Sequence, residues 1–348
     1  MAISDIHSNL SEREKSILQT IVHLYILKAS PIGSRYLAKY FDQLGKLSPA
    51  TIRNVMADLE EMNYISHPHT SAGRIPTDKG YRFFVDSLND IESLSGTEIK
   101  TVQEIVSSNY PEDILRDASK VLGALSNFLG IVEIPHLEEL KVERIEIIPL
   151  STTRLLVVLA LDSKIVRTVN LEAEFEIDLS RLSEIWTYIN EKISGKPLRF
   201  LRDNFSQMMQ DSPYHDRSLV KVFIESVDKI FEYHGAEDRL IIAGTKHLLK
   251  NPEFEDIQKV RGIFEILENE EIIVNLLEKS EEETNPLKIL IGKEIKNEKL
   301  DDYSIVISSY QFGSATGSIG LIGPKRMNYP KMISLVQHVA KKISQSVQ

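Results

Sequence analysis

The segment 48–64 carries its polar side chains in an order that could read DNA. Hydroxyl, guanidinium and amide groups come first, at Ser48, Thr51, Arg53 and Asn54, and carboxylates follow only in the second half. An arginine can donate two hydrogen bonds to a guanine edge, and an asparagine can pair with an adenine edge. A recognition helix keeps its carboxylates away from the end that enters the groove, because phosphates repel them. An ordinary exposed helix face would explain this segment alone about equally well.

The apolar residues around these groups predict a helix-turn-helix. Ser48 is a predicted N-cap, Pro49 stands at the first helical position, and apolar residues then recur at three-to-four spacing, namely Ile52, Val55, Met56, Leu59 and Met62. Earlier helices are predicted from the N-cap Ser11 to about residue 28 and again after Gly33. Three short helices, the last two joined by a short connection, are typical of this motif.

The residues that follow predict a wing. Pro68 and Pro76 are unsuited to a helix interior, and residues 70–73 supply small side chains and a glycine for a hairpin turn. Thr77 is the predicted N-cap of a further helix over 78–88. The tip of the hairpin carries polar residues that can reach a phosphate backbone or a minor groove, namely His69, Thr70, Ser71 and Arg74.

The net charge of −10 is carried wholly by the later part of the chain. Residues 1–90 hold 10 basic and 10 acidic residues, so 31 of the 41 basic and 41 of the 51 acidic residues lie in 91–348. Local basic clusters, here within 28–53 and 74–82, decide whether phosphates are attracted. The predicted DNA-contacting residues are therefore Arg35, Lys46, Ser48, Thr51, Arg53, Asn54, His69, Thr70, Ser71, Arg74, Lys79 and Arg82.

Other reactive residue types indicate no catalytic or metal site. The chain has no cysteine, and His67 and His69 have no clear third ligand, so no metal is predicted. The glycines of 313–327 lack the lysine and the spacing of a phosphate loop. Carboxylates gather in polar runs at predicted helix ends, so neither an enzyme nor a cofactor is predicted. The apolar run 155–161 is too short to span a membrane and no signal pattern precedes it, so a cytoplasmic protein is expected.

Beyond residue 90 the periodicity predicts an α+β fold. A polar stretch at 91–110 is expected to be a linker. Strands are predicted within 144–171, helices within 179–277, and strands again from 287. This order predicts an antiparallel sheet whose two halves are separated by a mainly helical insertion.

Three stretches resemble the HrcA family of bacterial heat-inducible transcription repressors. They are residues 47–86 ("LSPATIRNVMADLEEMNYISHPHTSAGRIPTDKGYRFFVD"), 243–256 ("AGTKHLLKNPEFED") and 317–339 ("GSIGLIGPKRMNYPKMISLVQHV"). The first is a long contiguous match that covers the whole predicted recognition helix and wing. The sequence departs from the family pattern at Asn63, where a glycine is expected, and residues 172–240 carry little that matches.

The resemblance implies a domain organisation and a function. It implies a winged-helix DNA-binding domain (1–90), a linker (91–110), a GAF-like domain in two segments (111–171 and 241–348) and an inserted dimerising domain (172–240). It also implies a homodimer that binds an inverted-repeat operator in double-stranded DNA and represses chaperone operons until heat shock, with the chaperonin maintaining its active form. Two alternatives are a winged-helix regulator that responds to a small ligand and an enzyme fused to a DNA-binding module.

One apolar helix face in the acidic part of the chain is a candidate dimer interface. Its residues recur at three-to-four spacing, namely Leu219, Val222, Phe223, Val227, Ile230 and Phe231. A face that covers only its own domain has the same pattern. The sequence alone leaves both interpretations open.

Overall fold

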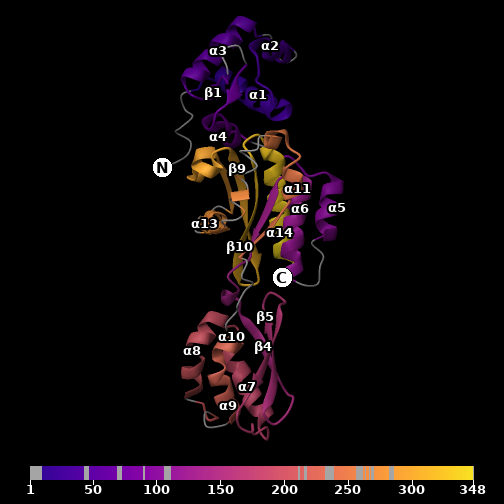
Figure 1. Cartoon of the computed structure of the whole chain (residues 1–348), viewed down its shortest axis with the longest axis vertical. Helices are drawn as coiled ribbons and strands as arrows, with labels where there is room; N and C mark the ends of the chain where they lie inside the picture. Colours follow the sequence, from indigo (N-terminus) through magenta and orange to yellow (C-terminus); the bar gives the residue numbers. More distant parts are fainter. Residues whose placement is uncertain are drawn as a thin grey trace.

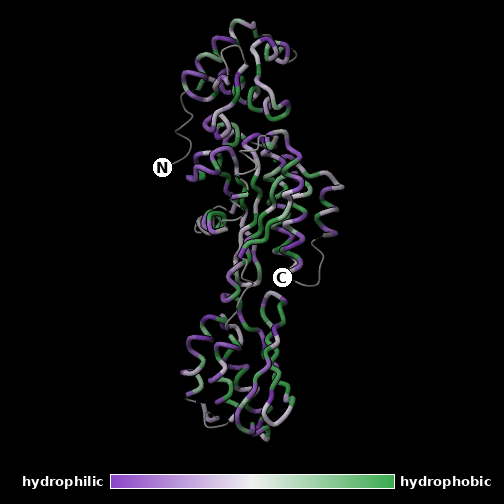
Figure 2. The backbone as a smooth tube through the Cα atoms, in the orientation of Figure 1, coloured by the Kyte–Doolittle hydropathy of each residue, from purple (hydrophilic) through white to green (hydrophobic). Residues whose placement is uncertain are grey.

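The computed structural model contains three bodies arranged in a row (Figure 1). The structure describes residues 10–42, 47–68, 73–88, 91–105, 111–210, 212–214, 218–231, 239–255, 262, 264–265, 267, 270–281 and 286–347. The winged helix (12–86) stands at one end, the central body (96–133 and 240–347) in the middle, and the inserted domain (141–231) at the other end. Apolar residues are concentrated along the sheets of the central body and of the inserted domain (Figure 2).

The winged helix forms as its caps and apolar stripes predict. Its elements are α1 (Glu12–Lys28), α2 (Ser34–Asp42), α3 (Pro49–Glu61), β1 (Ile65–Ser66), β2 (Ile75–Pro76) and α4 (Asp78–Asp86). The predicted N-caps are confirmed, because Ser11, Ser48 and Thr77 each accept a hydrogen bond from the backbone N–H three residues later. Each cap satisfies one of the N–H groups that a helix start leaves unpaired.

The end of α3 explains the departure from the family pattern at Asn63. This residue has a φ of 61°, and the Tyr64 N–H donates to Leu59 O at 2.9 Å. The left-handed region favours glycine, and asparagine is the next residue to tolerate it. Asn63 therefore makes the turn from α3 into β1 that a glycine would make.

The central body is built on one antiparallel sheet with strand order β7-β3-β10-β9-β8. Its helices α6 and α14 lie on one side of the sheet and α13 on the other (Figure 1), so β9 and β10 are almost wholly buried. β3, which precedes the inserted domain, lies between two strands that follow it. The elements are α5 (Gly96–Ile105), α6 (Pro111–Ser126), β3 (Leu129–Glu133), β7 (Leu240–Ala243), α11 (Thr245–Leu248), η3 (Pro252–Glu255), α13 (Glu270–Glu281), β8 (Leu287–Ile291), η4 (Gly292–Ile295), η5 (Glu298–Leu300), β9 (Tyr303–Phe312), β10 (Ala315–Pro324) and α14 (Tyr329–Ser346).

The inserted domain has its own three-stranded sheet with order β4-β5-β6, reached through the short turn η2 (Leu137–Glu139). Its elements are β4 (Val142–Pro149), β5 (Arg154–Leu161), β6 (Val166–Glu172), α7 (Leu182–Ile193), α8 (Leu198–Gln210), α9 (Ser218–Glu225) and α10 (Val227–Phe231). The predicted antiparallel α+β architecture is confirmed, but the insertion begins near Lys141 and not at residue 172. Alternation of apolar residues predicts a strand but does not say which sheet the strand joins.

The predicted linker is partly a structural element of the central body. Within residues 91–110, α5 packs against α6 and α14. Glu98 on α5 forms an ion pair with Lys331 at 2.6 Å, and Asn328 Nδ2 donates to Glu92 Oε2 at 2.8 Å. The connection between the winged helix and the central body is therefore fixed at several points.

The helix face proposed from the sequence as a dimer interface is buried inside the inserted domain. Phe205 of α8 lies between two rings of that face, with centroid distances of 6.4 Å to Phe223 and 5.3 Å to Phe231. Val227 is partly buried, and the others are at most 2% exposed, namely Leu219, Val222, Phe223, Ile230 and Phe231. These residues form a core within one chain, so the dimer-interface interpretation of this face is corrected.

In the described part of the chain, every helix is too short or too polar to cross a membrane.

Candidate nucleic-acid interface

α3 presents a polar face to solvent and an apolar face to the winged-helix core. Arg53 and Asn54 are exposed, whereas Ile52 and Val55 are buried. Ser48 Oγ and Thr51 Oγ1 lie 2.9 Å apart at the start of the helix, and the Thr51 N–H donates to Ser48 Oγ at 3.1 Å. The first turns of α3 therefore expose a guanidinium and an amide, the two groups that the sequence predicts to meet base edges.

α2 adds basic groups on the same end of the molecule. It packs against α3, and Arg35 and Lys39 are exposed on it. Lys28, at the end of α1, lies 3.5 Å from the ring centroid of Tyr36. α2 and α3 lie at the outer end of the winged helix, away from the central body (Figure 1). In the described structure neither Arg35 nor Arg53 has an ion-pair partner, so both guanidinium groups are available for phosphates or bases.

Lys28, Tyr36 and Lys39 lie in this region but are not among the residues that the sequence predicts to contact DNA. The signal that could have added them is their spacing. Tyr36 and Lys39 occur three residues apart on one helix, so they share a face of that helix. Arg35 lies next to this face, because it directly precedes Tyr36. The contact between Lys28 and the Tyr36 ring could not be predicted from the sequence, because the two residues lie on different helices.

The base of the wing is tied to the connection between α1 and α2. β1 pairs with β2 through Ile65–Pro76 and Ser66–Ile75, and Ile32 and Arg74 exchange two backbone hydrogen bonds of 2.9 Å. A Cβ on Gly73 would lie 2.6 Å from the backbone carbon of Ile32. The glycine of the predicted hairpin turn therefore allows this close approach of two backbones.

Glu60 connects α3 to the residues that directly follow β1 and precede β2. Its Oε2 lies 2.7 Å from Arg74 Nη2, and its Oε1 contacts His67 Nδ1. Partial burial opposes ionisation of Glu60, but the contacts with His67 and Arg74 together lower its pKa below the ordinary value. Arg74 thus contacts a carboxylate at the wing base, which differs from the free tip residue expected from the sequence.

Lys79 and Arg82 point to other parts of the protein. Lys79 Nζ donates to Met62 O at 3.0 Å and lies 4.1 Å from the ring centroid of Tyr64. Arg82 binds Glu294 and the Ile289 carbonyl of the central body. We therefore remove Arg82 from the predicted DNA-contacting set, because its side chain belongs to the contact between two bodies. Lys46, His69, Thr70 and Ser71 lie outside the described residues.

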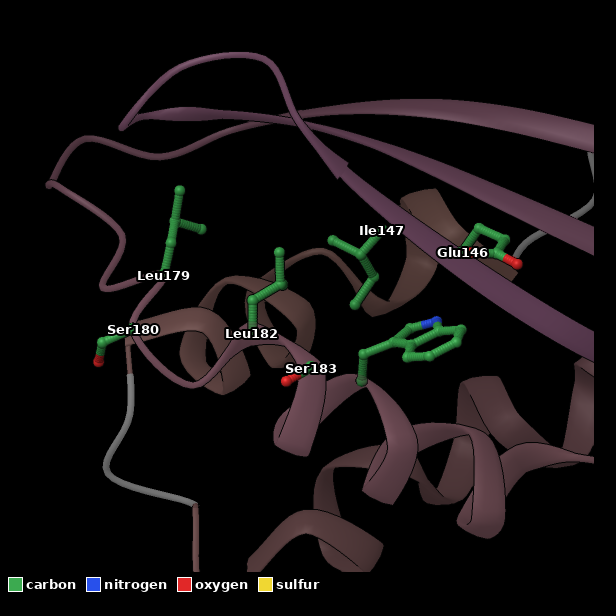
Figure 3. A pocket seen from close by; sticks show the side chains of 7 residues that line it. Glu146, Ile147, Leu179, Ser180, Leu182 and Ser183 are labelled. Carbon is green, nitrogen blue, oxygen red and sulfur yellow. The ribbon is translucent and has the colours of Figure 1, made fainter.

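The glycine-rich segment 313–327 and a pocket of the inserted domain show no catalytic arrangement of side chains in the described structure. The glycines of that segment lie mostly in β10, which is paired along its length with β9. A pocket of ≈ 380 Å³ lies between β4 and the start of α7, where Ile147, Leu182 and Trp186 line it (Figure 3). Its carboxylate, Glu146, is 3.3 Å from Arg144. No group of three or more metal-ligating side chains occurs among the residues with described positions.

Comparisons with known proteins agree with this geometry. The family described as winged helix-turn-helix transcription repressor, HrcA DNA-binding, matches residues 9–89, and the HrcA protein C-terminal domain matches residues 112–333. The chain is 38% identical over 351 residues to the heat-inducible transcription repressor HrcA of Chlorobium phaeobacteroides (strain BS1), covering 97% of this chain and 99% of that protein. It is 34% identical over 342 residues to the same repressor of Thermoanaerobacter sp. (strain X514), covering 96% of each.

A crystal structure of a protein described only as hypothetical has a TM-score of 0.64 to this chain at 26% identity. It covers 97% of this chain and 98% of its own, so the fold is shared along the whole length. The prediction of a transcription repressor and not an enzyme is confirmed by the family matches at both ends of the chain. The winged helix that exposes Arg53 and Asn54 is the part matched by the DNA-binding family, and the chain belongs to the HrcA family of heat-inducible transcription repressors.

Proposed function

We propose that this protein binds an inverted-repeat operator as a homodimer and represses chaperone operons in the cytoplasm until heat shock. The observation that carries the proposal is the outer end of the winged helix, where α3 exposes Arg53 and Asn54 beside the basic face of α2. One winged helix reads few base pairs, so two copies related by a dyad give the specificity that one genomic site requires. Ser48, Thr51 and Arg35 supply backbone contacts that hold the helix in its groove.

The partner copy is proposed to bind the open face of the sheet β4-β5-β6. α7, α8, α9 and α10 lie on the other face of this sheet (Figure 1). The open face carries apolar side chains on all three strands, namely Ile148, Leu156, Val158, Ala160 and Val166. Ile148 is 46% and Val166 63% exposed, which is unusual for large apolar residues on a sheet face. This face takes the place of the buried helix face in the dimer proposal.

A sedimentation experiment on the whole protein tests the dimer. Leu156→Glu combined with Val158→Glu adds like charges at the centre of both copies of the face, so we expect the variant to sediment as a monomer. Leu249→Glu is the matched control, because Leu249 is 42% exposed on the central body. A double variant that stays dimeric with an unchanged circular dichroism spectrum would exclude this face.

The central body is proposed to be a GAF-like domain that couples temperature to the dimer. Its sheet with helices on both sides and the inserted domain between its halves support this proposal, together with membership of the family. Warming is proposed to populate a state that does not bind DNA, and the chaperonin to restore the competent state. Footprinting on the organism's own chaperone promoters, at several temperatures with and without chaperonin, tests both parts. Protection that persists until the whole protein melts, or that ignores the chaperonin, would contradict the respective part.

A further inference from the structure

The winged helix contacts the central body through a compact set of partly buried charged side chains. The contact, which we call the docking joint, consists of Asp78, Tyr81 and Arg82 on α4, Ile26 of α1, and residues Glu253, Gly292, Lys293, Glu294, Lys325, Arg326 and Tyr329 of the central body. α4 and the end of α1 face the central body, opposite the exposed α2 and α3 (Figure 1). The joint therefore lies on the side of the winged helix opposite the proposed DNA-binding face.

Arg82 is the most highly connected side chain of the docking joint. Its Nε donates to Glu294 Oε1 at 2.8 Å, and its Nη2 contacts Glu294 Oε2 and donates to Ile289 O at 2.7 Å. Nη1 donates to Asp86 Oδ1 at 3.3 Å. A guanidinium that binds a carboxylate with two nitrogens fixes direction as well as distance, because its donors form a rigid plane.

Asp78 and Arg326 fix the winged helix at two further points. Asp78 accepts a hydrogen bond from Lys325 Nζ at 2.7 Å and one from the Lys293 N–H at 3.2 Å. Arg326 Nη1 donates to Ile26 O near the end of α1 at 2.6 Å, and its Nε contacts Glu253. Contacts on two different helices of the winged helix prevent rotation about either one.

The packing at the joint leaves little space for adjustment. Gly292 has a φ of 53°, and a Cβ there would lie 2.3 Å from Asp78 Oδ2. Beside it the rings of Tyr81 and Tyr329 lie 6.2 Å apart, and these residues are 3% and 0% exposed. Buried aromatic packing between two directional ion-pair sets makes one relative orientation strongly preferred.

We infer that Arg82, Asp78 and Arg326 are positioning residues that hold the recognition helix at one orientation to the central body, and so set the half-site spacing that the dimer accepts. The inference rests on the proposed dimeric operator complex. A rigid connection concentrates the second winged helix at its half-site when the spacing matches, and it penalises other spacings. A loose joint lowers the affinity for the matching operator and reduces the discrimination against operators with other spacings.

The joint itself is tested without DNA. The chain has no cysteine, so His23→Cys on α1 and Lys341→Cys on α14, both exposed, give two unique positions for spin labels. The doubly labelled full-length protein is diluted with unlabelled chains so that distances within one chain are measured. Pulsed electron paramagnetic resonance is expected to show one narrow distribution of the distance between the two labels. Arg82→Gln and Gly292→Ala are each expected to broaden it, the second variant with every charge retained. Arg181→Gln, which removes an exposed ion pair within the inserted domain, is the matched control and should leave it narrow.

The effect on DNA is tested with an operator selected by the wild-type protein from a random-sequence library. Arg82→Gln is expected to lower affinity for this operator by about tenfold, with the affinity for an isolated half-site unchanged. It is also expected to reduce the discrimination against an operator lengthened by about five base pairs, half a helical turn. The unchanged half-site affinity separates a positioning role from a loss of folding.

Each outcome bears on one proposal. A distance distribution that stays narrow in Arg82→Gln overturns the inference, whatever DNA shows. If Arg82→Gln broadens the distribution of label distances but still discriminates against the lengthened operator as the wild type does, the docking joint does not set the half-site spacing. A wild-type protein that binds one half-site as tightly as two contradicts the proposed dimeric operator complex, while the label distances still report on the joint.

Discussion

The outer and inner faces of the winged helix carry similar residue types but use them differently. On the outer face Arg35 and Arg53 are exposed and have no ion-pair partner in the described structure. On the inner face Arg82 is three-quarters buried, and its nitrogens bind carboxylates and a carbonyl. Charged groups that have partners hold the domain in place, whereas those left in solvent remain free to meet phosphates and bases.

The base of the wing lies between these two extremes. Arg74 is 26% exposed, and its guanidinium forms an ion pair with Glu60. Its guanidinium holds the base of the wing and is still partly open to solvent. The two faces can therefore be compared by mutating one cation from each and asking whether affinity, stability or neither changes.

The largest effect is expected for the exposed end of α3. Arg53→Ala should weaken binding to the selected operator by about 1–3 kcal/mol, with a much smaller loss on random DNA, because a base contact disappears. Asn54→Ala should behave in the same way. Fluorescence anisotropy titrations on both DNAs measure the difference, with Arg181→Ala as the control. Equal losses on the two DNAs would assign these side chains to phosphates only.

A smaller effect, on stability, is expected at Arg74. Arg74→Ala leaves Glu60 without its guanidinium partner, so the free energy of opening the wing should fall by about 1–2 kcal/mol. Hydrogen exchange at the amides of Ser66 and Ile75, which face each other across the two wing strands, measures this opening. Adding Glu60→Gln should cost little more, because the two residues act as a pair. Additive losses would show that they act separately.

A third expectation concerns the salt dependence of DNA binding. Arg35→Gln should reduce the slope of log K against log salt by roughly one, because its exposed guanidinium on α2 is expected to contact one phosphate. Lys79→Gln should leave the slope nearly unchanged, since its ammonium is held by Met62 O and the Tyr64 ring. The reverse result would show that intramolecular partners do not distinguish the two faces.

The smallest effect is expected at Glu98, on the segment that leads from the winged helix into the central body. Hydrogen bonds from Lys331 and from Ser95 lower its pKa from 4.5 to about 2. A carboxylate with a lowered pKa stabilises the folded state above pH 4.5, and this contribution is lost as the pH falls towards 2.

Glu98→Gln should therefore destabilise the protein at pH 7 by a few tenths of a kcal/mol, since the pair is near solvent. Urea unfolding of both proteins from pH 7 to pH 3 measures the difference, which should shrink below pH 4.5. If the difference in the free energy of unfolding does not change with pH, the ion pair between Glu98 and Lys331 is not the cause of the destabilisation.

Local features of the fold could be predicted from the sequence, and long-range ones could not. Ser11, Ser48 and Thr77 act on backbone groups three residues away, so their roles follow from spacing. The same holds for Arg53 and Asn54, whose exposure follows from the buried stripe of α3. These residues define both the recognition helix and its orientation in the domain.

Predictions that required a distant partner were the ones that changed. Arg82 looks like a basic residue beside a wing until Glu294, more than two hundred positions later, is placed against it. The apolar face that includes Phe223 and Phe231 has the same periodicity whether Phe205 or another chain covers it. The strands β4, β5 and β6 likewise give no sign of forming a separate sheet.

The position of β3 between β7 and β10 has a consequence for how the protein is made on the ribosome. The winged helix and the inserted domain are each continuous in sequence and can fold as soon as they emerge. The central sheet must wait for β8, β9 and β10, and the docking partners Lys325 and Arg326 follow β10 directly. In a nascent chain the winged helix can therefore fold before the residues of the central body that form the docking joint have been translated. The proposed selectivity for half-site spacing can therefore be acquired only after Lys325 and Arg326 have been translated.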